Sequence, residues 1–182
     1  MALAVRTAGR VARKAEIPVR LAGEADVPGL IGLINALARE AKLLFVVPID
    51  PETGAEGLVA FLHAAAASGN QTVIVAEVDG ALAGLVTATG GIHPAKRATV
   101  EIGIGVLEAM RGRGVGGALM AAIELWARGA GIHRLQLPVV TSNAPAIALY
   151  RKAGFEVEGV LRESAQVDGR SLDQFMMAKL LG

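Results

Sequence analysis

The sequence predicts a mixed α/β fold, a single domain built on a central sheet. Strand-like and helix-like segments alternate along the chain, and one of them, residues 71–91, has the pattern of a β-hairpin. No repeat or low-complexity linker divides the 182 residues. A chain of this length and continuity forms one domain, with at most a short appendage.

The first third of the chain predicts one strand and two helices. Residues 17–44 predict a short strand followed by an amphipathic helix, with Asp26 as its N-terminal cap. Residues 51–70 predict a second helix that ends at Gly69 and Asn70, because these residue types favour the helix C-terminus.

The middle of the chain predicts three strands and a third helix. In residues 71–91, two β-rich runs are joined by Asp79 and Gly80, a pair suited to a type I′ turn. Residues 98–109 predict the next strand, and residues 114–131 predict a helix that ends in glycines.

The last third predicts a strand, a short helix and two more strands. These segments are residues 132–141, 143–154, 155–166 and 170–181. A turn at Asp168 and Gly169 joins the last two strands. The complete predicted order is β-α-α-β-β-β-α-β-α-β-β, which is typical of a mixed α/β domain.

Residues 1–15 form a basic N-terminal extension, and residues 16–182 form the domain. The extension contains four basic residues and no acidic one: Arg6, Arg10, Arg13 and Lys14. It lacks the apolar core of a secretory signal. We expect it to be unstructured and assign it no function.

The composition excludes several classes of function. The chain has no cysteine, which removes disulfides, thiolate metal sites and a cysteine nucleophile, and which fits a reducing cytoplasm. The net charge of +1 gives no general indication of nucleic-acid binding. No apolar run reaches the roughly 18 residues of a membrane helix. We therefore expect a soluble cytoplasmic protein that binds neither nucleic acid nor membrane.

The stretch from Met110 to Met120 contains four glycines and two arginines at the junction of a strand and a helix. A glycine turn at the start of a helix exposes amide N–H groups that no helical carbonyl can pair, at the positive end of the helix dipole. Such a turn is an anion site, and Arg111 and Arg113 can add charge at its rim. The alternative is a turn whose glycines serve close packing alone.

This stretch does not match two other phosphate-binding patterns. Gly112, Gly114 and Gly117 have the GxGxxG spacing of dinucleotide-binding folds. However, no acid follows about 20 residues later, and the preceding strand follows a hairpin rather than opening a parallel βαβ unit. The GK[ST] of a Walker loop is also absent.

Two motifs carry a resemblance to a known family. The first is Arg111-x-x-Gly114-x-Gly116, and the second is the N-x-x-A-x-x-x-Y-x-x-x-G-F block from Asn143 to Phe155. With the order of elements from residue 17 to 181, they make the chain resemble the GNAT superfamily of N-acetyltransferases, in particular its bacterial small-molecule subgroup. The resemblance implies a twisted, mostly antiparallel sheet of about six or seven strands flanked by about four helices.

The resemblance also implies acetyl-CoA as co-substrate, with no metal. The glycine turn would hold the diphosphate, and the preceding strand would lie beside the pantetheine arm. The implied cofactor-binding residues are Ile104, Gly105, Val106, Arg111, Gly112, Arg113, Gly114, Val115, Gly116, Gly117 and Asn143.

Acetyl transfer from a thioester to an amine needs a neutral amine, a polarised carbonyl and a proton for the leaving thiolate. It needs no covalent enzyme intermediate. Tyr150, the single tyrosine, stands where the family places its general acid. Its alternative role is packing of the helix. Asn143 is expected to cap that helix and to bind the cofactor arm, and the Val106 N–H to stabilise the oxyanion.

Glu101 is the predicted general base. Alternation along the strand puts Glu101, Gly103 and Gly105 on one face and the apolar residues on the other. The carboxylate could then reach an incoming amine through water, whereas a one-residue slip would turn it away. A structural polar contact is the alternative.

The other candidate residues have simpler interpretations. His93, in the loop before this strand, is a second candidate for the base. His63 and His133 are interpreted as structural or solvent-facing, and Trp126 as a core residue.

The acceptor is expected to be the primary amine of a small molecule, an amino acid or another amine. Relatives that acetylate ribosomal-protein N-termini tend to carry a glutamate where this chain has Pro138, which disfavours that acceptor. The segment 41–57 should line the acceptor pocket and has few charges from Phe45 to Ile49.

The alternatives to this function are acetylation of a protein N-terminus or lysine, and a non-catalytic acyl-CoA-binding regulator. The family resemblance also allows a homodimer.

Overall fold

The computed structural model describes residues 17–40 and 46–182. The elements follow the predicted order: β1 (Val19–Leu21), α1 (Val27–Glu40), α2 (Gly54–Ser68), β2 (Gln71–Val78), β3 (Ala81–Gly90), β4 (Thr99–Val106), α3 (Val115–Gly129), β5 (Arg134–Val140), α4 (Ala144–Lys152), β6 (Glu156–Val167) and β7 (Arg170–Leu180). Short 3₁₀ turns lie at Glu24–Asp26, Pro94–Lys96 and Glu108–Met110. The predicted extension at residues 1–15 lies outside the described residues. No helix in the described part of the chain is long and apolar enough to cross a bilayer.

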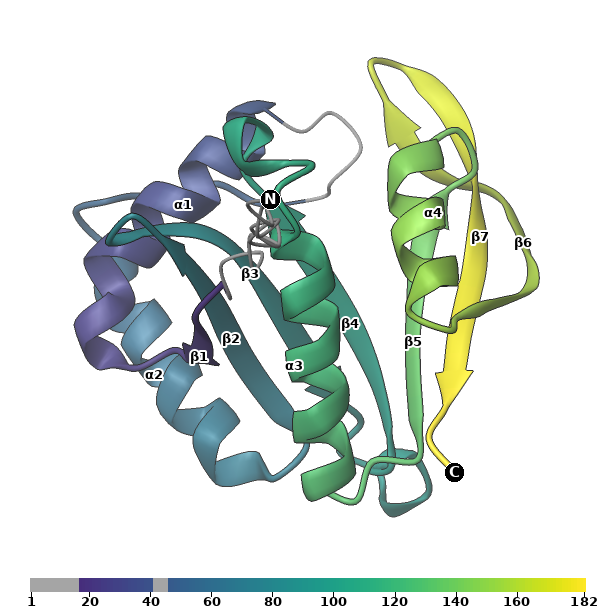
Figure 1. The fold of residues 1–182 in the computed structure, drawn as a ribbon, viewed down its shortest axis with the longest axis horizontal. Coiled ribbons are helices and arrows are strands. Elements are labelled where there is room, and N and C mark those ends of the chain that lie inside the picture. The colour runs from purple at the N-terminus through teal and green to yellow at the C-terminus, as the bar shows by residue number, and fades with distance from the viewer. Residues whose placement is uncertain (1–16, 41–45) are drawn as a thin grey trace, which may run out of the picture.

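The strands form one seven-stranded sheet in the order β1-β2-β3-β4-β5-β7-β6. Neighbouring strands are antiparallel except for β4 and β5, which are parallel (Figure 1). The expectation of a mostly antiparallel sheet with four flanking helices is confirmed for the residues that the structure describes.

The sheet has an apolar core on each face. Alternate residues of β2 show the division, because Ile74 belongs to a core with α3 and α4, whereas Val73 and Val75 belong to a core with α1 and α2. Leu119 of α3 and Tyr150 of α4 are buried in the first core. The helix that follows the glycine turn and the helix that carries the tyrosine therefore cover the same face.

The central pair of strands separates after a short contact. β4 pairs with β5 only from Thr99 to Glu101, opposite Arg134 to Gln136. Beyond that point β4 stays paired with β3, and β5 stays paired with β7. Figure 1 shows β4 and β5 side by side at the lower end of the view and apart at the upper end, where α3 begins. A gap therefore opens in the middle of the sheet.

Local turn chemistry accounts for the ends of several elements. Asp79 (φ 53°) and Gly80 (φ 78°) both have positive φ, as the expected type I′ turn requires. Asp168 (φ 50°) and Gly169 (φ 74°), predicted only as a turn, have the same signs of φ. The helix α2 ends at Gly69 in the left-handed conformation, as predicted.

Asp26 does not cap α1 in the way that the sequence suggested. Its carboxylate accepts a hydrogen bond from the Gly23 N–H (2.8 Å) and forms an ion pair with Arg20 (2.7 Å). The side chain therefore closes the preceding 3₁₀ turn, because a guanidinium from β1 lies close enough to hold it there. The same contacts lower the pKa of Asp26, with the Arg20 hydrogen bond as the main cause.

A polar cluster ties the two helices of the first core to the last strand. Lys179 of β7 donates to Glu124 of α3 (2.6 Å) and to the Ala153 carbonyl at the end of α4 (2.7 Å). Arg128 also binds Glu124, at 2.9 Å. The hydrogen bond from Lys179, followed by that from Arg128, lowers the pKa of Glu124.

We predict that Glu124→Gln lowers the free energy of unfolding by about 1 kcal/mol at neutral pH, a value limited by partial solvent exposure. Because the folded-state pKa is lowered, the stabilisation is complete above the ordinary value of 4.5 and is lost as the pH falls through the folded-state value. Urea unfolding at neutral pH and in acid would measure the difference, which should shrink as the pH falls below 4.5. Glu156→Gln, at an exposed site on β6, is the matched control. A difference that persisted unchanged in acid would contradict the prediction.

Candidate active site

The edge of β4 that faces the gap carries backbone groups that β5 does not pair. The Leu107 N–H donates to the Ala83 carbonyl of β3 (3.0 Å). Because N–H directions alternate along a strand, Gly105 and Gly103 also face β3, whereas Ile104 and Val106 direct their N–H and C=O groups into the gap. The Val106 carbonyl accepts a hydrogen bond from Arg111 Nε at 3.3 Å, which agrees with a carbonyl that faces away from β3.

The opposite edge of the gap lacks one donor. The Arg134 N–H donates to Ala98 at the start of the β4–β5 contact (3.1 Å). By the same alternation, the nitrogen of Pro138 also faces β4, but pairing with β4 has ended at Gln136. The proline therefore removes no ladder bond, and β5 presents a donor-poor edge to the gap.

The glycine turn lies where β4 leads into α3. Gly112 (φ 73°) and Gly114 (φ 99°) have positive φ, and α3 begins after Gly114 without a side-chain cap. The first-turn N–H groups of Val115, Gly116 and Gly117 consequently have no acceptor within the helix. A Cβ at Gly112 or Gly117 would meet open space. The turn thus has the geometry of an anion site at the mouth of the gap.

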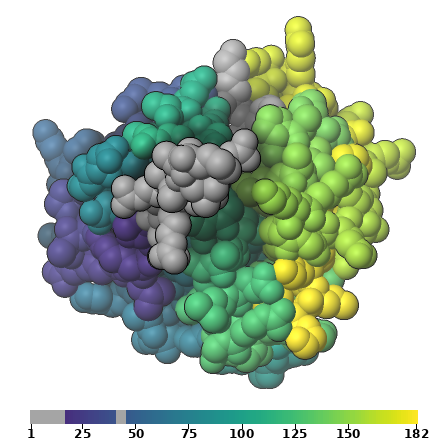
Figure 2. All heavy atoms as spheres, viewed as in Figure 1, coloured from purple at the N-terminus to yellow at the C-terminus, as the bar shows by residue number. Residues whose placement is uncertain are grey.

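Gly116 also has a packing role. A Cβ there would lie 3.0 Å from the Leu149 side chain of α4, so the missing side chain leaves room for that leucine. Figure 2 shows the face that bears α3 and α4, with the surface hollowed between them. The packing interpretation of the glycines therefore holds for this one position.

The two arginines of the turn differ in their contacts. Arg111 reaches back to the end of β4, as described above. Arg113 is exposed, with Met110 Sδ at 3.1 Å and the Asp79 carboxylate at 3.8 Å. Both guanidinium groups remain at the rim of the glycine turn.

The helix α4 positions Asn143 and Tyr150. The Asn143 side-chain oxygen accepts from the Ala146 N–H (3.3 Å), so it caps the helix as expected. Tyr150 is 7% exposed, and its ring lies 6.1 Å from that of Phe155. Burial raises the pKa of Tyr150 to about 12, which keeps the phenol protonated across the physiological range.

Glu101 lies on the face opposite Tyr150. Val100 and Ile102 are buried in the core with α3 and α4, and alternation directs Glu101 to the other face, where it is exposed. It belongs to the last β4–β5 pair, beside Thr89 on β3 and Gln136 on β5. The structure therefore brings Glu101 to the point where the gap begins.

The remaining sequence candidates lie elsewhere or have structural contacts. His93 Nδ1 accepts from the Ala95 N–H (3.2 Å) and so caps the short turn after β3. His63 is exposed, 3.5 Å from Glu24. Trp126 packs against the first core, as expected. Phe45, in the segment predicted to line the acceptor pocket, lies outside the described residues.

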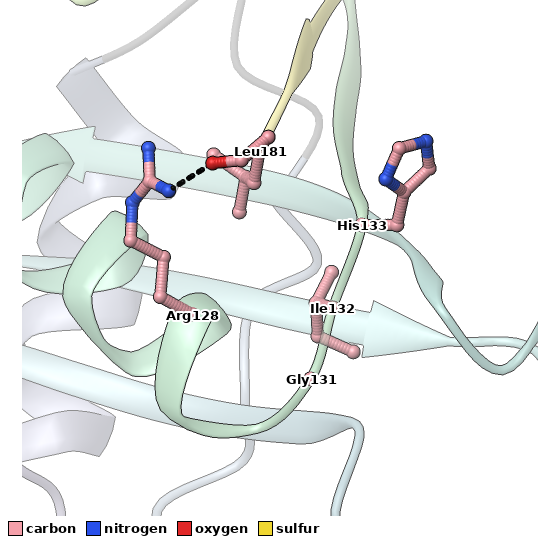
Figure 3. A pocket seen from close by; sticks show the side chains of 6 residues that line it. Arg128, Gly131, Ile132, His133 and Leu181 are labelled. Atoms are coloured by element: carbon pink, nitrogen blue, oxygen red, sulfur yellow. Dashed lines mark hydrogen bonds between the residues drawn. The ribbon is translucent and has the colours of Figure 1, made fainter.

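A shallow hollow at the far end of α3 is separate from the glycine turn. Arg128, His133 and Leu181 line it, and Arg128 donates to the Gly182 carbonyl at 2.9 Å (Figure 3). Because the gap and the anion site lie at the other end of α3, this hollow contributes nothing to them.

The acetyltransferase (GNAT) family model matches residues 34–155, which include the gap, the glycine turn and α4. The chain belongs to the GNAT acetyltransferase family. It is 30% identical over 162 residues to the L-methionine sulfoximine/L-methionine sulfone acetyltransferase of Pseudomonas paraeruginosa, across 87% of this chain and 91% of that protein.

Two solved GNAT structures show the same fold. An acetyltransferase from Streptococcus pneumoniae is 30% identical, with a TM-score of 0.84 over 92% of this chain and 100% of that one. A phosphinothricin acetyltransferase from Sinorhizobium meliloti, in complex with acetyl-CoA, is 25% identical, with a TM-score of 0.79 over 91% of this chain and 89% of that one. The expected family and fold are confirmed.

Sequence reasoning missed Gln136. Alternation within residues 132–141 places it on one face with Arg134, but no local pattern indicates that β5 lies beside β4. Its position next to Glu101 follows only from the parallel pairing.

We predict that Gly114→Ala raises the Kd for coenzyme A at least tenfold. A Cβ at φ 99° strains the backbone, by about 1–2 kcal/mol or more, and turns the first N–H groups of α3 away from a bound anion. Isothermal titration of the variant and the wild type would measure the effect. Gly129→Ala, in open space at the end of α3, is the matched control. Equal affinity in all three proteins would show that this turn does not bind the cofactor.

Proposed function

We propose that this GNAT protein transfers an acetyl group from acetyl-CoA directly to the primary amine of a small molecule, an amino acid or a related amine. The observation that carries the proposal is the gap between β4 and β5. It leads from an anion site to the strand pair that holds Glu101, which lies on one face of the sheet while Tyr150 lies on the other. The P. paraeruginosa relative, whose name specifies derivatives of an amino acid, supports this acceptor class.

The cofactor is proposed to bind along the gap. Residues 112–117 would hold the diphosphate through backbone N–H groups, with Arg111 and Arg113 adding charge. The pantetheine arm would then extend along β4 as an added strand, bonded to the backbone of Ile104 and Val106 and passing Gly105. The Asn143 oxygen is occupied by its helix cap, so its NH₂ group is the end that can donate to the arm.

The proposed chemistry uses one group from each face. Glu101 takes a proton from the amine, directly or through water, and the amine nitrogen attacks the thioester carbon. The Val106 N–H, directed into the gap, donates to the oxygen as negative charge develops there. The C–N bond forms and the C–S bond breaks, and the products are the amide and coenzyme A.

Tyr150 is proposed to supply the proton of the leaving thiol. A thiol of ordinary pKa near 8.5 is more acidic than a phenol, so full proton transfer before the C–S bond breaks is unfavourable. The hydroxyl therefore acts chiefly as a hydrogen-bond donor to sulfur while the C–S bond lengthens. The proton passes as the bond breaks, and solvent then restores it to the phenol.

We predict that Tyr150→Phe lowers kcat by about 10²-fold or more, since general acid catalysis contributes 10²–10⁴-fold. The Kd for coenzyme A and the melting temperature should change little, because the aromatic ring remains. In the wild type, the phenol stays protonated below its pKa of about 12. Wild-type activity should therefore begin to fall near pH 11, whereas a phenol of ordinary pKa near 10 would begin to lose its proton near pH 9. Full activity of the phenylalanine variant would exclude the acid role.

A panel of amines tests the function itself. We expect wild-type protein with acetyl-CoA to release thiol and form an N-acetyl product, detected by mass spectrometry, with at least one α-amino acid. The panel should include L-methionine sulfone, simple alkylamines, polyamines and a ribosomal N-terminal peptide. Glu101→Gln should reduce kcat/KM for every accepted amine.

Three results of the panel would contradict the proposal. Tight binding of coenzyme A without turnover of any amine would indicate a regulator. Turnover of the peptide alone would indicate a protein acetyltransferase. Absence of coenzyme A binding would contradict the proposed cofactor site.

A further inference from the structure

The last pair between β4 and β5 joins Glu101 to Gln136. Residues in register on adjacent strands carry their side chains on the same face, about 5 Å apart. The face is the one opposite α3 and α4, because the alternate residues Ile102 and Leu137 are buried in the core with those helices. A carboxylate and a carboxamide therefore lie side by side where the gap begins.

Arg134 determines which end of the Gln136 carboxamide can bind a ligand. Its Nε donates to Gln136 Oε1 at 3.0 Å. A guanidinium has donors only, so the oxygen of the carboxamide must face Arg134. The NH₂ group lies on the other arm of the planar carboxamide and is directed away from the arginine.

Arg134 is itself held by Glu158 of β6. Its two terminal nitrogens donate to the two carboxylate oxygens, one of them at 2.7 Å. This bidentate pair offsets the charge of the guanidinium and uses one N–H of each terminal nitrogen, which weakens its attraction for an anionic ligand. Of the adjacent pair, Gln136 therefore offers an NH₂ donor and Glu101 a carboxylate acceptor.

We propose that Gln136 is an acceptor-binding residue that selects α-amino acids. Its NH₂ group donates to the carboxylate of the acceptor, while Glu101 faces the amino group. An α-amino acid carries these two groups on one carbon, which matches two side chains on adjacent strands. The inference rests on the proposed function and identifies its substrate class.

Gln136→Glu tests the role with little disturbance of the fold. The glutamate keeps an oxygen for Arg134 and replaces only the NH₂ donor by a second oxygen. Steady-state kinetics would compare L-methionine with 3-(methylthio)propylamine, the same molecule without its carboxylate. We expect KM for L-methionine to rise about tenfold or more, because a hydrogen bond to a charged group is lost and a repulsion is added. KM for the propylamine and for acetyl-CoA should not rise, so the ratio of the two acceptors' kcat/KM values reports the lost contact with the carboxylate.

Two further variants complete the test. Gln136→Leu removes the donor without adding charge, so it should raise KM for the amino acid alone, by a smaller factor. Gln166→Glu adds the same charge at an exposed position near the β6–β7 turn and should change neither KM. Thermal melting would establish that each variant is folded.

The outcomes separate the two proposals. An equal change in KM for both acceptors, no change for either, or a wild-type preference for the propylamine would overturn the role of Gln136 and leave the proposed function standing. Failure of the wild-type protein to acetylate any amine would overturn the proposed function, and this inference with it.

Discussion

The site depends on the early end of the pairing between β4 and β5. Two parallel strands that stayed in register would satisfy each other's backbone and leave no opening. Here each strand remains bonded on its outer side, β4 to β3 and β5 to β7, so their separation leaves both halves of the sheet intact. The free-energy cost of unpaired backbone groups is confined to one edge of β4, whose N–H and C=O groups face the gap. Pro138 reduces the corresponding cost on β5, because it has no donor to leave unpaired.

Contacts on the helical side hold the two halves of the sheet together where the strands do not. Gly116 allows α3 to pack against Leu149 of α4, and Lys179 joins Glu124 of α3 to the end of α4. The same helices follow the glycine turn and carry Tyr150. The elements that compensate for the missing strand contact are thus the elements that carry the proposed cofactor site.

The division of the sheet into two faces explains how a direct transfer can work without a covalent intermediate. A buried phenol on the α3 and α4 side suits the hydrogen bond to a leaving sulfur. An exposed carboxylate on the other side suits an amine that arrives from solvent. In the proposed mechanism, both groups act on one thioester held in the gap without contacting each other.

Local chemistry determined much of this protein. The Asp-Gly turns, the glycine at the end of α2, the Asn143 cap and the glycine turn before α3 depend on residues a few positions apart, so the sequence alone predicts them. Alternation along β4 likewise placed Glu101 opposite the apolar residues. Other features depend on contacts between elements. Asp26 pairs with Arg20 because β1 lies beside the start of α1. Only the tertiary structure decided that β5 runs parallel to β4 for three residues and then leaves it. That choice sets Gln136 beside Glu101, because a strand's neighbour is selected by packing of the whole sheet and not by its own pattern of residues.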